Sequence, residues 1–443
     1  MTRPGKSSIV HRLPFFYGWI IVVVATLGTI MTNPGQTPVV SIFIDRFIAD
    51  LNLSRSLVST LYLLGTLAGG LSLSFWGIQI DRRGTRTMMT LIAGLLGLAC
   101  IYMGFVNNAL MLGLGFVFLR MLGQGSLSLV SQTTINQWWV RRRGLVVGIS
   151  GVAVSLLGLG LFPNMVHGLL ERYGWRVTYP ILGSALLLGM VPLAFLFVRD
   201  RPEDYGLKPD GEGSTENDED LPGAKPLEPP TASSAGFLSE EPAWTLGEAV
   251  RTQAFWAVGL AVGVSSMLGT GLYFHMVDIF HSRGLPPDVA AAVYIPIAIT
   301  GALVRLTSGY MADRLPLRYL LAAAMGVLTT ILLLATTLNS VPIALVYGVL
   351  LGLNGGLMST VGGVIWADYF GRKHLGSIAG LAGSFGTIGS ALGPLPLGLA
   401  RDLTGAYDLA LWIGAALPLF LLVANVVVGP PTRGRARAHE VTQ

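Results

Sequence analysis

Long apolar runs separated by short polar loops make up most of the chain. A helix that spans a membrane needs about 20 consecutive, mostly apolar residues, and the sequence holds twelve such runs. We therefore predict an all-α membrane protein with twelve transmembrane helices. The predicted spans are residues 17–44, 57–80, 87–106, 109–133, 145–169, 176–198, 254–280, 288–311, 318–338, 341–366, 375–400 and 408–429.

The stretch between the sixth and seventh runs differs in composition from the rest. Residues 199–250 hold the acidic sequence 210–220 followed by four prolines, Pro222 to Pro230. Such a composition cannot bury a core, which predicts a disordered cytoplasmic linker. The expected domains are a six-helix bundle over 1–198 and a second over 251–443, which ends in a short basic tail.

A short repeat relates the two predicted bundles. The motif G-x-x-x-D-R follows the second span and recurs after the eighth, at the second helix of each half. Its residues are Gly77, Asp81 and Arg82 in the first copy and Gly309, Asp313 and Arg314 in the second. Two parallel repeats of this kind predict a transporter with its site between the halves near mid-membrane. We expect these six residues to take part in conformational gating.

Composition supports the membrane assignment, and charge gives the orientation. The 443 residues are 52% hydrophobic and 12% charged, whereas soluble domains are about 25% charged. Most loop Lys and Arg residues fall on the side of both termini and the linker, so the positive-inside rule places that side in the cytoplasm. The net charge of +5 is spread over short loops and gives no sign of nucleic-acid binding. We expect a monomer as the functional unit in the lipid bilayer.

The reactive side chains do not form the sets that enzymes or metal sites need. The single cysteine, Cys100, lies in an apolar run, which excludes disulfides and cysteine metal sites. The six histidines are scattered, and none forms a pattern with Cys100. We therefore expect no enzymatic activity, no catalytic residue, no metal and no cofactor.

Two arginines lie deep in the apolar runs, Arg120 in the fourth span and Arg305 in the eighth. A guanidinium keeps its charge and costs at least about 2.5–3.5 kcal/mol in hydrocarbon, yet no Asp or Glu lies equally deep. A substrate anion would supply the missing counter-ion through a two-pronged contact. The alternative is that each arginine hydrogen-bonds backbone carbonyls of a broken neighbouring helix. Both arginines are candidate substrate-binding residues.

Polar residues near a break in the first span are further candidates. Pro34 and Gly35 interrupt that span, and the carbonyls freed there either line a cavity or mark a packing kink. The candidate substrate-binding residues are Asn33 and Gln36 at the break, with Tyr62, Gln124, Tyr347 and Asn354 elsewhere. For the last four, an interhelical hydrogen bond is the alternative.

One pair of titratable residues is a candidate for proton coupling. His275 and Asp278 lie one turn apart near the outer end of the seventh span. Protonation of these two side chains would be part of the coupling between proton and substrate transport. The alternative is a solvated helix end.

Several motifs resemble those of the major facilitator superfamily. Gly77, Asp81, Arg82, Gly84 and Arg86 resemble the signature loop of that superfamily. The second G-x-x-x-D-R motif resembles a weaker copy of the same loop. Within the superfamily the chain is most similar to the monocarboxylate transporter family and its bacterial relatives, including oxalate/formate exchangers. The stretches that carry this similarity are 17–19, 138–144, 201–207 and 303–313.

The resemblance implies a fold, a location and two residue roles. The fold would be the major facilitator fold in a plasma membrane, here a bacterial inner membrane. Arg305 stands in place of the family's helix-8 arginine, which binds the substrate carboxylate. Asp81 would tie its loop to the eleventh span in the outward-open state.

Departures from the family pattern limit what can be carried over. Many animal members have an aspartate where this chain has Gly301, and a lysine where it has Gly35. Their proton relay therefore does not transfer. Residues 375–400 contain no Lys or Arg, although the oxalate exchangers place a second cation there, which weighs against a dianionic substrate.

The sequence thus predicts a secondary active transporter of a small organic monocarboxylate, coupled to protons and working by alternating access. One alternative is an anion exchanger for dicarboxylates or an oxalate/formate-like pair, with Arg120 as second cation. Another is a drug or metabolite exporter, although this chain has no deep carboxylate that would attract a cationic drug. A channel or a non-transporting receptor stays open on the sequence alone.

Overall fold

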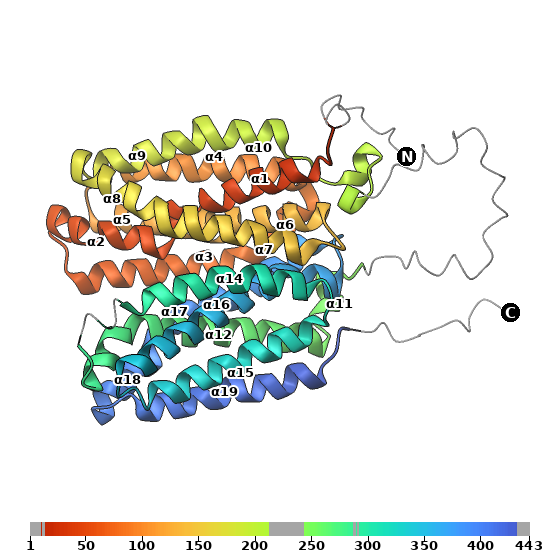
Figure 1. Cartoon of the computed structure of the whole chain (residues 1–443). Coiled ribbons are helices and arrows are strands. Elements are labelled where there is room, and N and C mark those ends of the chain that lie inside the picture. Colours follow the sequence, from red (N-terminus) through yellow and green to blue (C-terminus); the bar gives the residue numbers. More distant parts are fainter. Residues whose placement is uncertain (1–9, 11–13, 212–242, 287–288, 290–291, 432–443) are drawn as a thin grey trace, which may run out of the picture.

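The computed structural model describes residues 10, 14–211, 243–286, 289 and 292–431 (Figure 1). All regular structure in these residues is helical, and twelve helices or joined helices are long and apolar enough to cross a membrane. The predicted all-α fold with twelve spans is confirmed. The predicted basic tail beyond residue 431 lies outside the described residues.

The first six spans are continuous or jointed helices. They comprise α1 (Gly18–Ile30), η1 (Asn33–Gly35), α2 (Thr37–Leu51), α3 (Arg55–Arg83), α4 (Thr85–Met103), α5 (Ala109–Leu119), η2 (Arg120–Leu127), α6 (Ser128–Trp138), α7 (Arg143–Ala153), η3 (Val154–Leu161), α8 (Phe162–Tyr173), α9 (Trp175–Ala185), η4 (Leu186–Met190) and α10 (Val191–Phe197). The other six comprise α12 (Gln253–Ser282), α14 (Tyr294–Ala312), α15 (Leu317–Ala335), α16 (Val341–Phe370), α17 (Leu375–Leu392), α18 (Pro394–Thr404) and α19 (Asp408–Val427).

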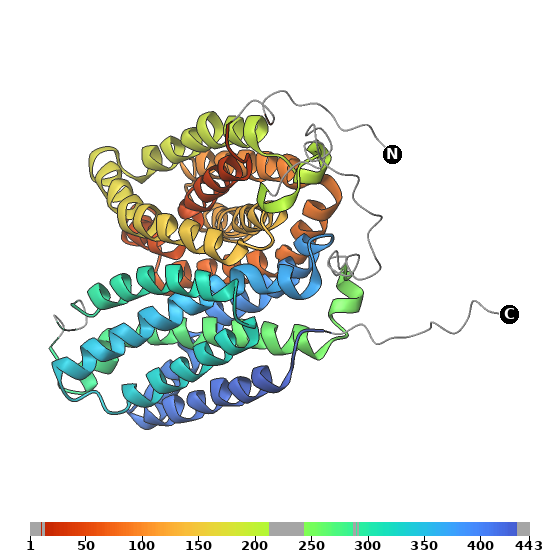
Figure 2. The same ribbon diagram turned by 45° about the vertical axis from the view of Figure 1, so that its right-hand side comes forward.

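The helices form two groups that lie side by side. Figures 1 and 2 show α1 to α10 together in one bundle and α12 to α19 in the other. The bundles meet mainly where α3 packs on α17 and where α7 packs on α14. We call the end where α1 begins and α19 ends the basic face, because Arg82, Arg141, Arg314 and Arg372 lie there; it is on the right in Figure 1.

Several spans are interrupted in the middle of the bundle. The first is broken at η1, as the sequence predicts, because Pro34 has no N–H to donate to the helix. The fourth, fifth and sixth contain the π-helical segments η2, η3 and η4, and the eleventh is interrupted at Gly393, between α17 and α18. Such interruptions often occur at functional sites.

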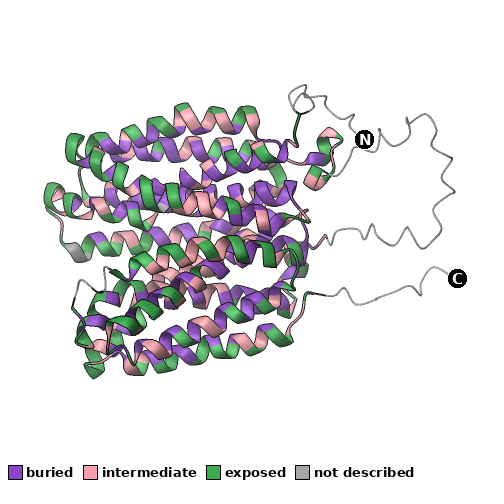
Figure 3. Cartoon of the chain, in the orientation of Figure 1, coloured by how far each residue is buried: buried purple, intermediate pink, exposed green. Residues whose placement is uncertain are grey.

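The outer surface of the bundles is strongly apolar. Exposed residues cover the outward faces of the helices in Figure 3, and Leu188, Phe274 and Leu403 are 80%, 70% and 82% exposed. A surface of this kind is stable only when lipid covers it. The chain is therefore an integral, multi-pass membrane protein.

Both ends of the predicted linker are ordered, which corrects the expectation of disorder over all of 199–250. Two 3₁₀ turns, η5 (Pro202–Tyr205) and η6 (Pro209–Gly211), follow α10, and α11 (Leu246–Ala249) precedes α12. A capping box of Thr245 and Glu248 starts α11, while the Asp210 carboxylate accepts hydrogen bonds from the backbone N–H groups of residues 140–142. Residues 212–242 lie outside the described part.

Candidate functional site: a polar cavity between the bundles

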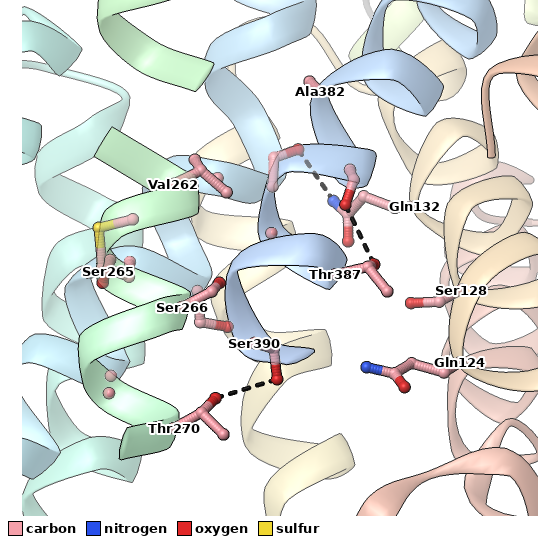
Figure 4. A pocket seen from close by; sticks show the side chains of 18 of the residues that line it. Gln124, Ser128, Gln132, Val262, Ser265, Ser266, Thr270, Ala382, Thr387 and Ser390 are labelled. Atoms are coloured by element: carbon pink, nitrogen blue, oxygen red, sulfur yellow. Dashed lines mark hydrogen bonds between the residues drawn. The ribbon is translucent and has the colours of Figure 1, made fainter. Parts of the chain in front are cut away.

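A cavity of about 620 Å³ lies between the two bundles and is lined by both. This volume is within the range of about 300–1,000 Å³ typical of small-molecule sites. The N-terminal bundle contributes one wall of amides and a hydroxyl, and α12, α16 and α17 contribute hydroxyl-rich walls opposite (Figure 4). The polar lining residues are Gln124, Ser128, Gln132, Ser265, Ser266, Thr270, Tyr273, Asn354, Ser359, Thr387 and Ser390.

The described lining carries no charged side chain, so hydrogen bonding dominates its chemistry. Some groups already have partners: Thr270 and Ser390 share a hydrogen bond of 3.0 Å, and Gln132 Nε2 donates to the Gly363 carbonyl at 3.0 Å (Figure 4). In contrast, Gln124 Oε1 is buried without a hydrogen-bond partner among the described residues. A buried acceptor of this kind is costly unless water or a ligand satisfies it.

Arg305 lies on α14 at the seam between the bundles. Its Nη1 donates a hydrogen bond of 3.1 Å to the carbonyl of Gly151 on α7, while its Nε is buried without a partner. Among the described residues, no carboxylate forms an ion pair with it. Arg305 is not among the described residues that line the cavity, but its helix α14 packs against α16, which forms part of the cavity wall. Arg305 therefore lies at the seam, on a helix next to the cavity wall.

Arg120 is in a different environment, inside the N-terminal bundle. It is 3% exposed, and its Nε donates to Thr66 Oγ1 at 2.9 Å. Its Nη1 donates to the Gly35 carbonyl at 3.0 Å and to Thr37 Oγ1 at 3.2 Å, and its guanidinium lies 4.8 Å from the Tyr62 ring centroid. The arginine thus satisfies a carbonyl freed at the break in the first span.

The other candidates at that break also form local hydrogen bonds. Asn33 Nδ2 donates to the Ile30 carbonyl at 2.7 Å, and Gln36 Nε2 donates to Thr32 Oγ1 at 3.0 Å. Asn33, Gln36, Tyr62 and Arg120 are not among the described residues that line the cavity. Their predicted role as substrate ligands stays a prediction, and the geometry fits a packing role at the break.

The fold places the remaining two candidates, Asn354 and Tyr347, in different environments. Asn354 lines the cavity, although its Nδ2 also donates to the Ala324 carbonyl at 2.7 Å. Tyr347 is completely buried, with its ring centroid 5.7 Å from that of Phe280. Of the predicted polar residues, the structure therefore brings Gln124 and Asn354 into the cavity wall.

Sequence reasoning missed most of the hydroxyl groups in the wall. Ser266, Thr270 and Tyr273 recur at helical spacing along α12, and Thr387 and Ser390 do the same on α17. A polar stripe on an otherwise apolar span was the available signal, since side chains three or four residues apart share one helix face.

The two aspartates of the repeat make equivalent contacts across the bundles at the basic face. The Asp81 carboxylate accepts from the N–H groups of Gly376 and Ser377, both at 2.7 Å, at the start of α17. The Asp313 carboxylate accepts from Gly144 N–H at 2.6 Å and Leu145 N–H at 2.9 Å, at the start of α7. A helix N-terminus favours a negative charge, so each aspartate clamps a helix of the opposite bundle.

Close backbone contacts accompany both clamps. A Cβ atom at Gly77 would collide with the Gly376 carbonyl, and one at Gly309 would lie 2.6 Å from the Gly144 carbonyl. Within the described part of the chain, no contact of this kind is found for the predicted gating arginines: Arg82 is exposed, and Arg314, just beyond α14, lies 4.0 Å over the Tyr310 ring of that helix. Burial raises the pKa of the Asp313 carboxyl, although the backbone hydrogen bonds from Leu145 and Gly144 act in the opposite direction.

Further hydrogen bonds join the bundles at the basic face. Gln137 Nε2 donates to the Arg372 carbonyl at 2.9 Å, and Arg372 Nη1 donates back to the Gln137 carbonyl at 2.6 Å. Asn136 Nδ2 donates to the Gly363 carbonyl at 2.8 Å. The bundles are therefore held together on this side of the cavity.

His275 and Asp278 meet near the opposite face, away from the described cavity lining. The Tyr407 hydroxyl donates to Asp278 Oδ2 at 2.5 Å and lies 3.3 Å from His275 Nδ1, and Arg401 Nε is 3.5 Å from Asp278. His275 Nε2 lies 3.0 Å from the Pro394 carbonyl at the break in the eleventh span. Burial, then the hydrogen bond and charge of Asp278, raises the pKa of Tyr407 to about 12.

Comparisons with known proteins agree with this architecture. The family model for the Major Facilitator Superfamily matches residues 15–338 and 297–442. Human monocarboxylate transporter 11 is 27% identical over 369 residues, which are 76% of this chain and 67% of that protein. The uncharacterized MFS-type transporter YhjX of Escherichia coli is 25% identical over 294 residues, 65% of each chain. This chain thus matches about two thirds of the length of these relatives.

Two solved structures show the same fold. A crystal structure of a double-tryptophan mutant of XylE aligns with a TM-score of 0.68 and 16% identity, over 95% of this chain and 97% of that one. The human organic anion transporter MFSD10 aligns with a TM-score of 0.64 and 16% identity, over 94% and 100% of the two chains. At these identities the similarity concerns the fold alone.

Proposed function

The chain belongs to the Major Facilitator Superfamily and is a membrane transporter rather than an enzyme, and from this premise we propose that it carries a small organic monocarboxylate with a proton. Transport would proceed by alternating access, in which the bundle of residues 1–198 rocks against the bundle of residues 251–443 around the central cavity. The name of human monocarboxylate transporter 11 agrees with this substrate class.

The observation that carries the proposal is the unpaired charge of Arg305. The guanidinium lies at the seam between the bundles, and only its Nη1 has a hydrogen bond, with the Gly151 carbonyl. Its Nε and Nη2 have no hydrogen-bond partner among the described residues. These two groups form one edge of the guanidinium and match the two oxygens of a carboxylate. A substrate anion bound there would neutralise the charge and satisfy the buried Nε.

The clamps at the basic face support the alternating-access part of the proposal. We place this face in the cytoplasm because it gathers the arginines of the short loops. Asp81 and Asp313 both hold helices of the opposite bundle at this face, which in the proposed orientation would be a state closed toward the cytoplasm. Inward opening then requires both aspartates to leave the helix N-termini that they cap.

The route of the coupling proton follows from the residues available. Arginine does not release its proton at physiological pH, and no Asp, Glu or His is among the described residues that line the cavity. The proton would therefore travel on the substrate carboxyl or through the pair of His275 and Asp278 at the rim.

The environment of Arg120 favours a monocarboxylate over a dianion. An exchanger for dicarboxylates would use Arg120 as a second cation, but that side chain is buried and bonded to Thr66, Gly35 and Thr37. Export of cationic drugs is disfavoured because no carboxylate is among the described lining residues.

Uptake into proteoliposomes tests the proposal. The purified chain is reconstituted and given labelled lactate, pyruvate, acetate, formate, oxalate and larger acids, with and without an imposed pH gradient. Arg305→Lys should abolish uptake because a point charge replaces the two-pronged edge. The matched control is Arg46→Lys, an exposed arginine paired with Glu171, which should transport normally. Near-normal uptake by Arg305→Lys would contradict the proposal.

A further inference from the structure

We propose that the acid carried by this protein is polyhydroxylated, with a carboxylate at one end and several hydroxyl groups along the rest of the molecule. The inference rests on the proposed function, since Arg305 receives the carboxylate. It adds the class of the remaining part of the substrate, which the cavity wall would recognise by hydrogen bonds.

The first argument is the number of polar groups in the wall that lack a partner. Gln124 Oε1 is buried without a hydrogen bond, and the hydroxyls of Ser128, Ser266 and Ser359 form no hydrogen bond with any described residue. All four side chains line the cavity. An acid with a bare hydrocarbon tail would displace water from these groups and leave them without hydrogen bonds. Each lost hydrogen bond would lower the affinity for the acid about tenfold.

The second argument is the position of these groups. In Figure 4, Gln124 and Ser128 point from the N-terminal bundle toward Thr387 and Ser390 on α17, and Ser266 and Thr270 lie on α12, across α17 from them. The donors and acceptors thus come from both bundles rather than from one element of the wall. A substrate with hydroxyl groups along its length would meet partners from both bundles at once.

The third argument is the size and charge of the cavity. Its volume of about 620 Å³ is more than a two- or three-carbon acid fills. Because the described lining is uncharged, a second carboxylate or an ammonium group would find no partner in the wall. Neutral hydroxyl groups are the polar groups that such a wall accepts without a charge penalty.

Competition with matched acids tests the inference. Gluconate and hexanoate have the same number of carbons and the same charge, but hexanoate lacks the hydroxyl groups. In proteoliposomes that take up labelled gluconate, unlabelled gluconate should inhibit at a concentration at least about tenfold lower than hexanoate or lactate. A site that hydrogen-bonds its substrate rejects the analogue without those groups.

Wall variants show whether the preference comes from the cavity. Gln124→Leu and Ser266→Ala should each reduce the ratio of hexanoate to gluconate inhibition constants several-fold. Because the ratio is measured within one preparation, lower expression of a variant does not change it. Thr330→Ala is the control, since its exposed hydroxyl donates to the Gly326 carbonyl within α15, away from the described cavity lining, and its ratio should stay at the wild-type value.

The outcomes separate this inference from the proposed function. If hexanoate or lactate is taken up in an Arg305-dependent way and gluconate is excluded or weaker, the polyhydroxylated substrate is wrong and the monocarboxylate function stands. The inference is equally wrong if both wall variants keep the wild-type ratio. If no acid is taken up, or Arg305→Lys transports normally, the proposed function itself fails.

Discussion

Removing the charge of Asp81 should shift the protein away from the state closed at the basic face. The carboxylate accepts two hydrogen bonds of 2.7 Å from the N–H groups that begin α17. In Asp81→Asn, one amide oxygen remains as acceptor, and the amide NH₂ faces backbone donors instead. The contact between α3 and α17 therefore loses one hydrogen bond and its charge.

The size of this shift follows from the strength of such bonds. Hydrogen bonds to a charged group contribute about 1.5–3 kcal/mol, and neutral ones about 0.5–1.5 kcal/mol. The change to asparagine should thus disfavour the closed basic face by about 1–3 kcal/mol, or roughly 5- to 150-fold in the equilibrium between the two states. Substrate affinity should change less, because Asp81 is not among the described residues that line the central cavity.

Distance measurements between spin labels on the two bundles provide the assay. Labels at Tyr173 on α8 and Leu403 on α18 are exposed at the opposite face, so their separation should shorten as that face closes. Cys100 is buried and should not react with the label. Asp50→Asn is the control, because Asp50 pairs with Arg176 inside one bundle.

Two results would refute the reasoning. If the distance distribution of Asp81→Asn matches the wild type, the clamp does not bias the conformational equilibrium. Asp313→Asn should shift the distances in the same direction, since it makes the equivalent contact with α7. Shifts of opposite sign in the two variants would contradict the equivalence of the two clamps.

Three further changes have defined outcomes. Gly77→Val should prevent α3 from approaching α17 at the basic face, because the new Cβ would collide with the Gly376 carbonyl. The distance between the same two spin labels should then shorten, and an unchanged distance would exclude the close contact. Arg120→Ala should destabilise the protein by about 1–3 kcal/mol, since it leaves the buried Gly35 carbonyl at the helix break without its partner, and a thermal melt in detergent should show a lower Tm than Arg46→Ala. The pKa of Tyr407 is raised from 10.0 to about 12, so the folded chain binds more protons than the unfolded chain in this window, and stability should fall as pH rises through it. Tyr407→Phe should show a shallower fall in Tm over the same pH range.

The repeat illustrates how far the sequence reaches toward mechanism. The motif placed Asp81 and Asp313 at equivalent points of two halves, and the structure shows both in contact with the opposite bundle. The sequence did not show which backbone groups receive them. Those are helix N-termini distant along the chain, and only packing brings them within hydrogen-bond distance.

The fourth span shows why candidate site residues were harder to predict. Arg120 and Gln124 lie about one turn apart, and both were expected at the substrate site. In the structure Arg120 bonds to the broken first span, whereas Gln124 faces the cavity. The π-helical geometry of η2 and the neighbouring helices set these directions, and neither is encoded in residue type.

The sequence by itself determined the number of spans and the all-α fold, because bilayer thickness and the cost of unpaired backbone groups in lipid act on each local stretch. It also identified the charge at Arg305, since a guanidinium in an apolar run is costly wherever it points. Only the tertiary structure decided that this charge lies at the seam between the bundles, and that scattered serine, threonine and glutamine side chains form one cavity. Those facts depend on how helices rotate and pack against each other, which is a property of the whole assembly.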